Sequence, residues 1–260
     1  MFSEELELAL DASREAGKIA MSFYRNRYLE VMTKRDASPV TKADQESEKK
    51  ITSLIKKKFP NDEILGEEFG SSKSKKSKTS QKRKWIIDPI DGTKSFIHGV
   101  PLFGMMIGFE IDDTPTVGVV HFPALGETYY AEKGQGAFRN LQRLSVSKIS
   151  TFSEATLLLT SPEYLTEEAK THPFYALRDE AKLVRMWGDC YGHCLVAAGE
   201  ADLMIDPKMN PWDCAALLPI LTEAGGKIFD FKGKYHSYGG SLVSANAALG
   251  KVMLSMISKH

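Results

Sequence analysis

The chain has 260 residues, of which 42% are hydrophobic, and this allows one large domain or two coupled halves around a sizeable core. Lys and Arg together number 34, as do Asp and Glu, so no excess charge favours nucleic acid or a membrane surface as a partner. No apolar run is long enough to span a bilayer, and the first residues are typical of an amphipathic helix rather than a signal peptide. Three cysteines do not suggest a disulfide framework, so we expect a cytoplasmic protein.

The first 140 residues contain two helical patterns followed by strands. Apolar residues recur with helical spacing over residues 1–30, and a second helix is expected over Asp44–Lys58. From Glu63 to Phe138 the sequence is typical of strands separated by turns rich in Gly, Pro, Asp and Asn. The expected strands are Ile64–Leu65, Trp85–Ile87, Phe103–Ile111, Val117–His121 and Thr128–Ala131.

From about Asn140 onwards, strands and helices alternate. The expected strands are Ala155–Thr160, Leu183–Met186, Leu203–Ile205, Lys227–Phe229 and Leu242–Ser244. The expected helices are Glu167–Glu180, Cys190–Ala198, Asp213–Ala224 and Ala247–Lys259. This pattern predicts mixed α/β layers, with an N-terminal α+β half over residues 1–140 and a C-terminal α/β half over 141–260 in one compact unit.

The segment Trp85–Thr93, with the sequence Trp-Ile-Ile-Asp-Pro-Ile-Asp-Gly-Thr, is the most informative stretch. Its apolar start predicts a buried strand that ends at Asp88-Pro89, and Asp91-Gly92 signals a turn. Two carboxylates are thereby delivered to one strand end, where a hard divalent cation would relieve their repulsion. Gly92 would let a phosphate approach the backbone closely, and Thr93 supplies a hydroxyl beside it. The alternative is a polar turn that binds nothing.

This nonapeptide resembles the metal-binding motif of the inositol monophosphatase family. Further segments resemble family motifs in the same order, and together they span about residues 5 to 250. They are Val-Thr-Lys-Ala-Asp at Val40–Asp44, Gly-Glu-Glu at Gly66–Glu68, Pro-Trp-Asp at Pro211–Asp213 and Glu-Ala-Gly-Gly at Glu223–Gly226. The resemblance implies a layered α-β-α-β-α sandwich, phosphatase activity, inhibition by lithium and a homodimer.

The resemblance also implies a metal site. The ligands that it assigns are Glu67, Asp88, the Ile90 carbonyl, Asp91 and Asp213. Hard oxygen ligands without His or Cys suit magnesium, with about two or three ions bound. For Asp213, a position in the first turn of a helix is compatible with a role as a ligand.

Further residues of the site are implied in the same way. In similar enzymes the aspartate at the position of Asp44 orients the threonine at the position of Thr93. The resemblance implies that Thr93 and Glu67 together position or deprotonate the attacking water. The backbone amides of Gly92 and Thr93 would hold the phosphate. For Asp44 alone, the alternative is an acid at a helix N-terminus that is stabilised by the helix dipole.

Asp189 and Asp206 bear on the substrate. Gly-Asp-Cys-Tyr around Asp189 resembles the histidinol-phosphate phosphatase branch of the family, and Asp206 stands where the family places an acidic substrate contact. Two carboxylates beside a phosphate dianion would repel it unless the substrate carries a cation, and histidinol phosphate carries an ammonium group and an imidazole. The alternatives are that Asp189 is an N-cap, that the enzyme hydrolyses inositol-1-phosphate, or that the protein is a catalytically silent metal- or phosphate-binding regulator.

Three other features have simpler interpretations. The Lys- and Ser-rich segment Ser71–Lys84 is expected to be a solvated loop rather than a nucleic-acid patch, although its lysines could attract a phosphate. Cys190 and Cys194 are expected to be core thiols rather than metal ligands. His193 is expected to be a packed or surface residue rather than a ligand.

Overall fold

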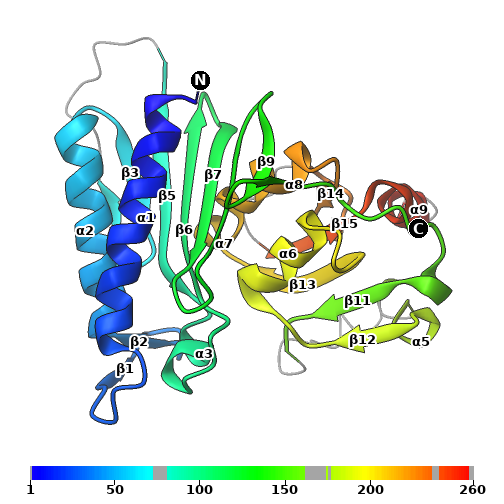
Figure 1. Ribbon diagram of the computed structural model, residues 1–260, viewed down its shortest axis with the longest axis horizontal. Helices are drawn as coiled ribbons and strands as arrows, with labels where there is room; N and C mark the ends of the chain where they lie inside the picture. Colours follow the sequence, from blue (N-terminus) through cyan, green and yellow to red (C-terminus); the bar gives the residue numbers. More distant parts are fainter. Residues whose placement is uncertain (1, 73–80, 162–173, 175–176, 236–239, 258–260) are drawn as a thin grey trace.

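Helices and sheets alternate in layers across the molecule (Figure 1). The computed structural model describes residues 2–72, 81–161, 174, 177–235 and 240–257. Two helices cover the outer face of an eight-stranded sheet, further helices separate it from a five-stranded sheet, and the last helices cover the far side. The layered α-β-α-β-α sandwich expected from the sequence is therefore confirmed.

The first helical layer consists of α1 (Glu4–Phe23) and α2 (Lys42–Lys58). A stripe of buried alanines lets α1 pack closely against α2 and the sheet. Residues 24–30 were expected to be helical, but α1 ends at Phe23. The chain then forms a hairpin of β1 (Val31–Thr33) and β2 (Pro39–Thr41), which the sequence did not predict.

The larger sheet is mostly an antiparallel meander. Its strand order is β10-β9-β8-β7-β6-β5-β3-β4, and among the described strands of this sheet only β3 and β5 pair in parallel. Its strands are β3 (Glu63–Gly66), β4 (Gly70–Ser72), β5 (Arg83–Asp91), β6 (Gly104–Ile111), β7 (Thr114–Phe122), β8 (Glu127–Glu132), β9 (Gly136–Arg139) and β10 (Gln142–Arg143). The expected strands of this half all lie within or overlap these elements, whereas β4, β9 and β10 were not predicted.

Strand β5 continues past the point where the sequence predicted its end. The strand was expected to stop at Asp88-Pro89, but it pairs with β6 as far as Asp91, with a shift of register between Asp88 and Asp91. Pro89 lies within this irregularity, where a residue without an N–H does not interrupt a regular ladder. The irregularity brings Asp88 and Asp91 to the same end of the strand.

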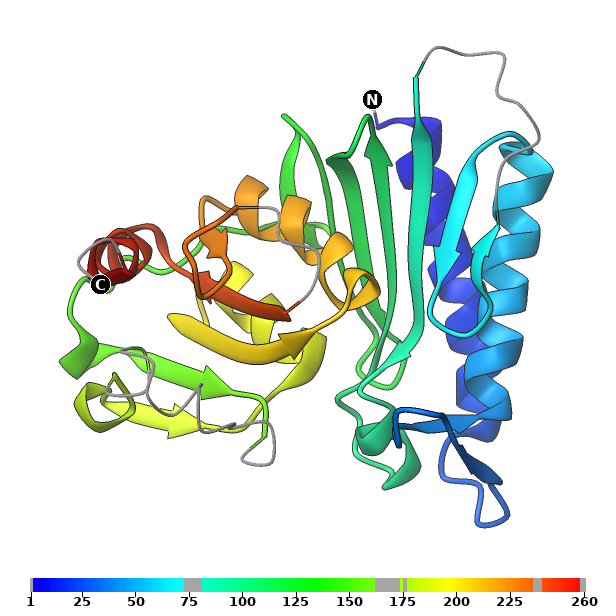
Figure 2. The same ribbon diagram turned by 180° about the vertical axis from the view of Figure 1, so that it is seen from behind.

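The middle helical layer lies between the two sheets (Figure 2). It contains α6 (Asp189–Ala197), α7 (Pro211–Ala215) and α8 (Leu217–Glu223). A single helix was expected over Asp213–Ala224, but the chain forms two helices that are separated at Ala216. A Cβ added at Gly118 of β7 would lie 2.0 Å from the Ala216 carbonyl oxygen, so the junction of the two helices rests directly on the larger sheet.

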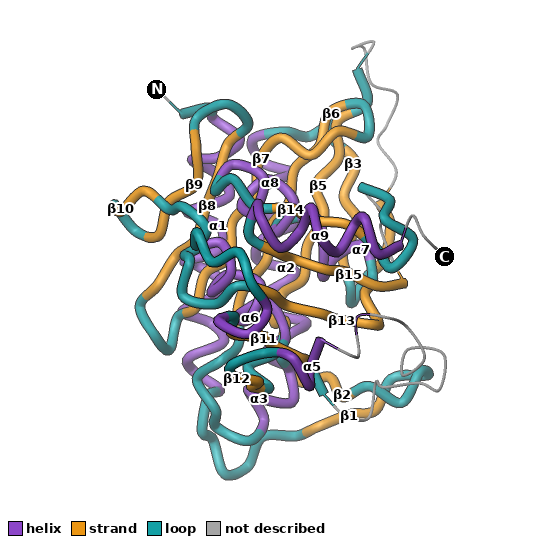
Figure 3. Tube along the Cα trace, turned by 90° about the vertical axis from the view of Figure 1, so that its right-hand side faces the viewer, coloured by secondary structure: helices purple, strands orange, loops and turns teal. Residues whose placement is uncertain are grey.

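The smaller sheet has the strand order β12-β11-β13-β15-β14. Its strands are β11 (Thr156–Leu159), β12 (Leu183–Arg185), β13 (Leu203–Met209), β14 (Lys227–Phe229) and β15 (Gly240–Ala245). Helices α5 (Leu177–Glu180) and α9 (Ala247–Ile257) form the outermost layer, on the side that faces the viewer in Figure 3. No helix among the described residues is long and apolar enough to cross a membrane.

Two sequence predictions fall partly on residues that are not described. Most of the expected helix Glu167–Glu180 lies outside the described residues, and α5 forms its end. Residues 73–80 of the expected loop Ser71–Lys84 are also outside them. The ends of that segment are strands rather than loop, because Ser71 pairs with β3 and Arg83 and Lys84 belong to β5. Arg83 forms an ion pair with Asp62, and Lys84 forms one with Glu110, and both pairs are partly buried.

Candidate metal centre and active site

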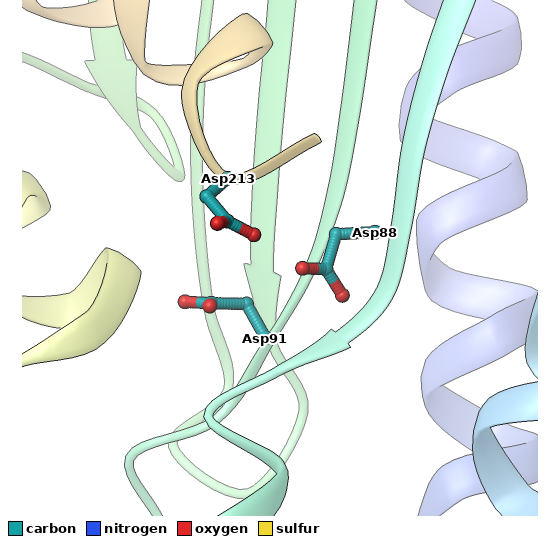
Figure 4. A group of neighbouring side chains, drawn as sticks. All are labelled: Asp88, Asp91 and Asp213. Atoms are coloured by element: carbon teal, nitrogen blue, oxygen red, sulfur yellow. The ribbon is translucent and has the colours of Figure 1, made fainter. Parts of the chain in front are cut away.

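Three aspartates converge at the end of β5 (Figure 4). Asp88 and Asp91 come from β5, and Asp213 comes from the first turn of α7. One carboxylate oxygen of each residue lies within 4.8 Å of those of the other two. Side chains more than 120 residues apart in the sequence thus share one small volume, and their oxygens are of the kind that Mg²⁺ prefers.

Hydrogen bonds from the backbone fix each of these carboxylates. Asp88 Oδ1 accepts from the Ile90 amide at 3.0 Å, and Asp91 Oδ2 accepts from the Cys190 amide at the start of α6 at 2.6 Å. Asp213 Oδ2 accepts from the Asn210 amide at 2.7 Å as part of a capping box. Asp213 therefore caps α7 and faces the cluster at the same time, as the sequence had allowed.

The cluster is electrostatically unfavourable on its own. Burial, reinforced by neighbouring carboxylates, raises the pKa of Asp88 and that of Asp91 well above their usual range. Burial also raises the pKa of Asp213 to about 6. Bound protons or a bound cation would relieve the repulsion, and a set of oxygen donors without nitrogen or sulfur fits magnesium better than zinc.

Glu67 lies beside the three aspartates. Its carboxyl group is in hydrogen-bond contact with Asp88, and burial raises its pKa. Lys34 Nζ, from the hairpin of β1 and β2, lies 2.7 Å from Glu67 Oε1 and 2.6 Å from Glu68 Oε1. Burial disfavours the Lys34 ammonium, but the two glutamates outweigh burial and raise the pKa of Lys34. No sequence motif pointed to this lysine, because the hairpin brings it to the site through tertiary contacts alone.

Thr93 and Asp44 are in contact, as the resemblance implied. Thr93 follows Gly92, whose φ of 78° is left-handed, and begins the short helix α3 (Thr93–Ile97). Thr93 Oγ1 lies 2.9 Å from the Ile90 carbonyl oxygen and 3.3 Å from Asp44 Oδ1. Asp44 is buried and accepts from the amide and the hydroxyl of Thr41 at the start of α2. Asp44 thus caps α2 and also faces the Thr93 hydroxyl.

Asp189 lies against the Gly92 turn. A Cβ added at Gly92 would lie 3.2 Å from Asp189 Oδ2. Asp189 is the first residue of α6 and follows Gly188, the N-cap of this helix. Its φ of 55° is unusual for a residue other than glycine, and strained backbone of this kind is common at functional sites. Burial raises the pKa of Asp189, and nearby Lys94 opposes this effect.

Asp206 belongs to the same acidic region. Its Oδ2 accepts from the Thr160 hydroxyl at 2.5 Å, and it is only 3% exposed. Burial, with further contributions from Asp189 and Asp213, raises the pKa of Asp206 to about 7. The structure therefore brings the acidic candidates for the site to one region, and adds Lys34 and Thr160, which sequence reasoning missed. These acidic residues are Asp44, Glu67, Asp88, Asp91, Asp189, Asp206 and Asp213.

The remaining candidates are core residues. Cys190, Cys194 and Cys214 are buried free thiols, and His193 is fully buried, with Nδ1 2.6 Å from Ser244 Oγ. Burial lowers the pKa of His193 to about 3, so this imidazole is neutral at physiological pH. The interpretation of Cys190, Cys194 and His193 as packed residues rather than ligands agrees with their positions.

The fold is a layered α/β sandwich, and a cluster of carboxylates lies at the end of one of its strands. These features place the chain among α/β proteins with a candidate metal site whose side-chain ligands are all oxygen atoms. Residues 2–259 match the model of the inositol monophosphatase family. The chain belongs to this family, whose members are metal-dependent, and the motif-based prediction of the family is confirmed.

Individual relatives cover nearly the whole chain. The histidinol-phosphatase of Chlorobaculum parvum is 48% identical, over 97% of this chain and 96% of that protein. The histidinol-phosphatase of Mycobacterium tuberculosis is 36% identical, over 99% of each. Among solved structures, the extragenic suppressor protein suhB of Bartonella henselae has a TM-score of 0.90 at 26% identity and covers 99% of both chains.

Proposed function

We propose that this protein is a magnesium-dependent phosphatase that hydrolyses L-histidinol phosphate to histidinol and phosphate. Family membership supports the class of reaction, and the relatives named histidinol-phosphatase support the substrate. Within the molecule, the proposal depends chiefly on Asp189, whose carboxylate lies against the Gly92 turn where we expect the phosphate.

The metal would be held by the carboxylates of Glu67, Asp88, Asp91 and Asp213 and by the Ile90 carbonyl. The convergence of the three aspartates and the absence of His or Cys among them fit Mg²⁺. When bound, the ions supply charge neutralisation for the phosphate and lower the pKa of a coordinated water. Lys34 Nζ contacts Glu67 Oε1, so its ammonium lies beside the proposed metal site and would favour the approach of the phosphate.

The Gly92 turn and Thr93 would bind the phosphate and orient the attacking water. The N-terminus of a helix favours a bound anion, and Gly92, the N-cap of α3, presents no side chain to block one. Thr93 Oγ1 can accept a hydrogen bond from the water while its own proton points to Asp44 or to the Ile90 carbonyl. Asp44 would therefore fix the direction of the Thr93 hydroxyl.

Asp189 and Asp206 would select the amino alcohol part of the substrate. A phosphate dianion at Gly92 places negative charge beside Asp189, and the two repel each other unless a cation lies near. The ammonium and imidazole of histidinol phosphate provide such a cation. Inositol-1-phosphate, the substrate of the alternative activity, presents only neutral hydroxyls.

The test is the variant Asp189→Asn, assayed with both substrates. Asn keeps the shape of the side chain and tolerates the left-handed backbone at this position, so the fold is retained. Loss of a charge-assisted contact costs about 1.5–3 kcal/mol, so kcat/KM for histidinol phosphate should fall roughly 10- to 150-fold. The value for inositol-1-phosphate should stay the same or rise, since a repelling carboxylate has been removed.

Parallel changes for the two substrates would mean that Asp189 has no role in substrate choice. Phosphate release by the wild type should also be abolished by excess chelator and restored by Mg²⁺.

The finer properties implied by the family remain part of the proposal. They are inhibition by lithium, about two or three bound ions and a homodimer. The cytoplasmic location inferred from the small number of cysteines is also a proposal. The carboxylate cluster supports only the metal dependence, and analytical ultracentrifugation would measure the state of assembly.

A further inference from the structure

Glu48, on the inner face of α2, is a buried carboxylate that has no part in the site described above. It is 1% exposed, although it lies one turn of α2 from Asp44. Burial of a carboxylate is costly unless hydrogen bonds compensate. The partners of Glu48 are backbone amides of the segment that follows β3, where Glu67 lies.

Glu48 holds this segment with both oxygens. Its Oε2 accepts from the Glu68 amide at 2.7 Å, and its Oε1 accepts from the Phe69 amide at 3.1 Å. A Cβ added at Gly66 would lie 1.9 Å from Glu48 Oε1, so the carboxylate rests directly on the backbone at the end of β3. Only glycine at position 66 allows this close approach.

Glu67 is thereby fixed on both sides. On one side, its own amide donates to the Ile87 carbonyl of β5 at 3.1 Å, next to Asp88. On the other side, the two amides that follow it are bound by Glu48. The direction in which the Glu67 side chain leaves the backbone therefore depends on Glu48 as well as on the sheet.

We infer that Glu48 is a positioning residue, which sets the orientation of Glu67 and through it the affinity of the metal centre. The inference rests on the metal site of the proposed function. Residues that orient ligands without touching the metal typically change metal affinity or activity by 10- to 100-fold when they are replaced. Glu48→Gln keeps one acceptor oxygen but turns an NH₂ group toward the second amide, so the turn should rearrange.

The matched control is Glu223 at the end of α8. Its two oxygens also accept from two backbone amides, those of Gly134 and Gly136, each at 2.8 Å. Gly134 lies in the connection between β8 and β9 and Gly136 is the first residue of β9, and neither segment carries any of the site residues. Glu223→Gln therefore makes the same chemical change away from the site.

The experiment measures Mn²⁺ binding by electron paramagnetic resonance in wild type, Glu48→Gln, Glu48→Asp and Glu223→Gln, together with urea unfolding in chelator. We expect Glu48→Gln to weaken Mn²⁺ binding roughly 10-fold or more and to raise the Mg²⁺ concentration for half-maximal activity. Glu48→Asp, which keeps both oxygens on a shorter side chain, should fall between wild type and Glu48→Gln. Glu223→Gln should lose stability without losing affinity.

Wild-type Mn²⁺ affinity in Glu48→Gln, or an equal loss of affinity in Glu223→Gln, would overturn the inference. If Glu48→Gln does not fold, Glu48→Asp decides, because unchanged Mn²⁺ affinity in that variant also overturns it. A wild type that binds Mn²⁺ but does not hydrolyse histidinol phosphate would contradict the proposed substrate and leave the role of Glu48 standing. A wild type that binds no Mn²⁺ would overturn the inference together with the metal site.

Discussion

At the scale of single residues, the clustered carboxylates of the acidic site lower the stability of the metal-free protein. Asp88, Asp91 and Asp213 are held close together by backbone hydrogen bonds, although burial and mutual repulsion raise their pKa values. Such a cluster costs folding free energy until a cation binds. Removing one charge should therefore have opposite effects on stability and on activity.

The variant Asp91→Asn tests whether removing one charge raises stability while it lowers activity. The amide oxygen of Asn can still accept from the Cys190 amide, but the variant lacks one negative charge at the cluster. Turnover should fall on the order of 100-fold or more, while the free energy of unfolding in chelator at pH 8 should exceed that of the wild type. Urea unfolding and phosphate release measure the two effects.

The control for that variant is Asp11→Asn on α1, whose side chain is 75% exposed and which should change neither quantity. Turnover of Asp91→Asn within a few-fold of wild type would show that Asp91 does not bind the metal.

Prediction from the sequence worked best for residues within contiguous motifs. Trp85–Thr93 contains two of the three clustered aspartates, because a strand and a turn place them by local geometry. Lys34 could not be predicted, since its ion pairs at the site are with Glu67 and Glu68, more than 30 residues away in the sequence. The role of each residue as a metal ligand or catalyst stays a prediction.

At the scale of elements, the existence of most helices and strands was predictable, but their ends were not. Sequence patterns placed α2, β6 and β7 nearly correctly, because apolar periodicity decides which side chains face the core. The predicted end of β5 was wrong, because an irregularity in the pairing with β6 accommodates Pro89 within the strand.

The division between α7 and α8 has a tertiary cause. A Cβ added at Gly108 of β6 or Gly118 of β7 would collide with Ala215 or Ala216, so these two glycines let the helix junction rest on the sheet. Glycine within a strand often marks such a close approach of another backbone. The two glycines are visible in the sequence, but the sequence does not show which backbone segment packs against them.

At the scale of the whole molecule, a chain with equal numbers of acidic and basic residues concentrates acid in one region. The site holds Glu67, Glu68, Asp88, Asp91, Asp189, Asp206 and Asp213, with Lys34 and Lys94 nearby. The balanced net charge gave no reason to expect a polyanionic partner, which stays a prediction, and it could not reveal this local excess of acid. The division into halves at about residue 140 stays a prediction.

The acidic region predicts how metal binding and stability depend on pH. Burial raises the pKa of Asp213 to about 6 and those of Asp206 and Glu68 to about 7, above the values of the unfolded chain. Between about pH 4 and pH 7 the folded, metal-free protein thus binds more protons than the unfolded chain, so the site's contribution to stability falls as pH rises. Mg²⁺ must displace such protons, so its apparent affinity should rise from pH 6 to pH 8.

Urea unfolding with chelator or with Mg²⁺, at several pH values, measures this linkage. The stabilisation by a fixed concentration of Mg²⁺ should be larger at pH 8 than at pH 6. An increment that is the same at both pH values would show that the raised carboxyl groups do not take part in metal binding.

The most direct test of the central claim is phosphate release by the purified wild type from L-histidinol phosphate and from inositol-1-phosphate, each with Mg²⁺ and with excess chelator. If Asp189 lies beside the bound phosphate and pairs with a substrate cation, kcat/KM should be about 10-fold or more higher for histidinol phosphate, and chelator should abolish both activities. Equal or greater specificity for inositol-1-phosphate would contradict the proposed substrate. Full activity in chelator would contradict the metal centre.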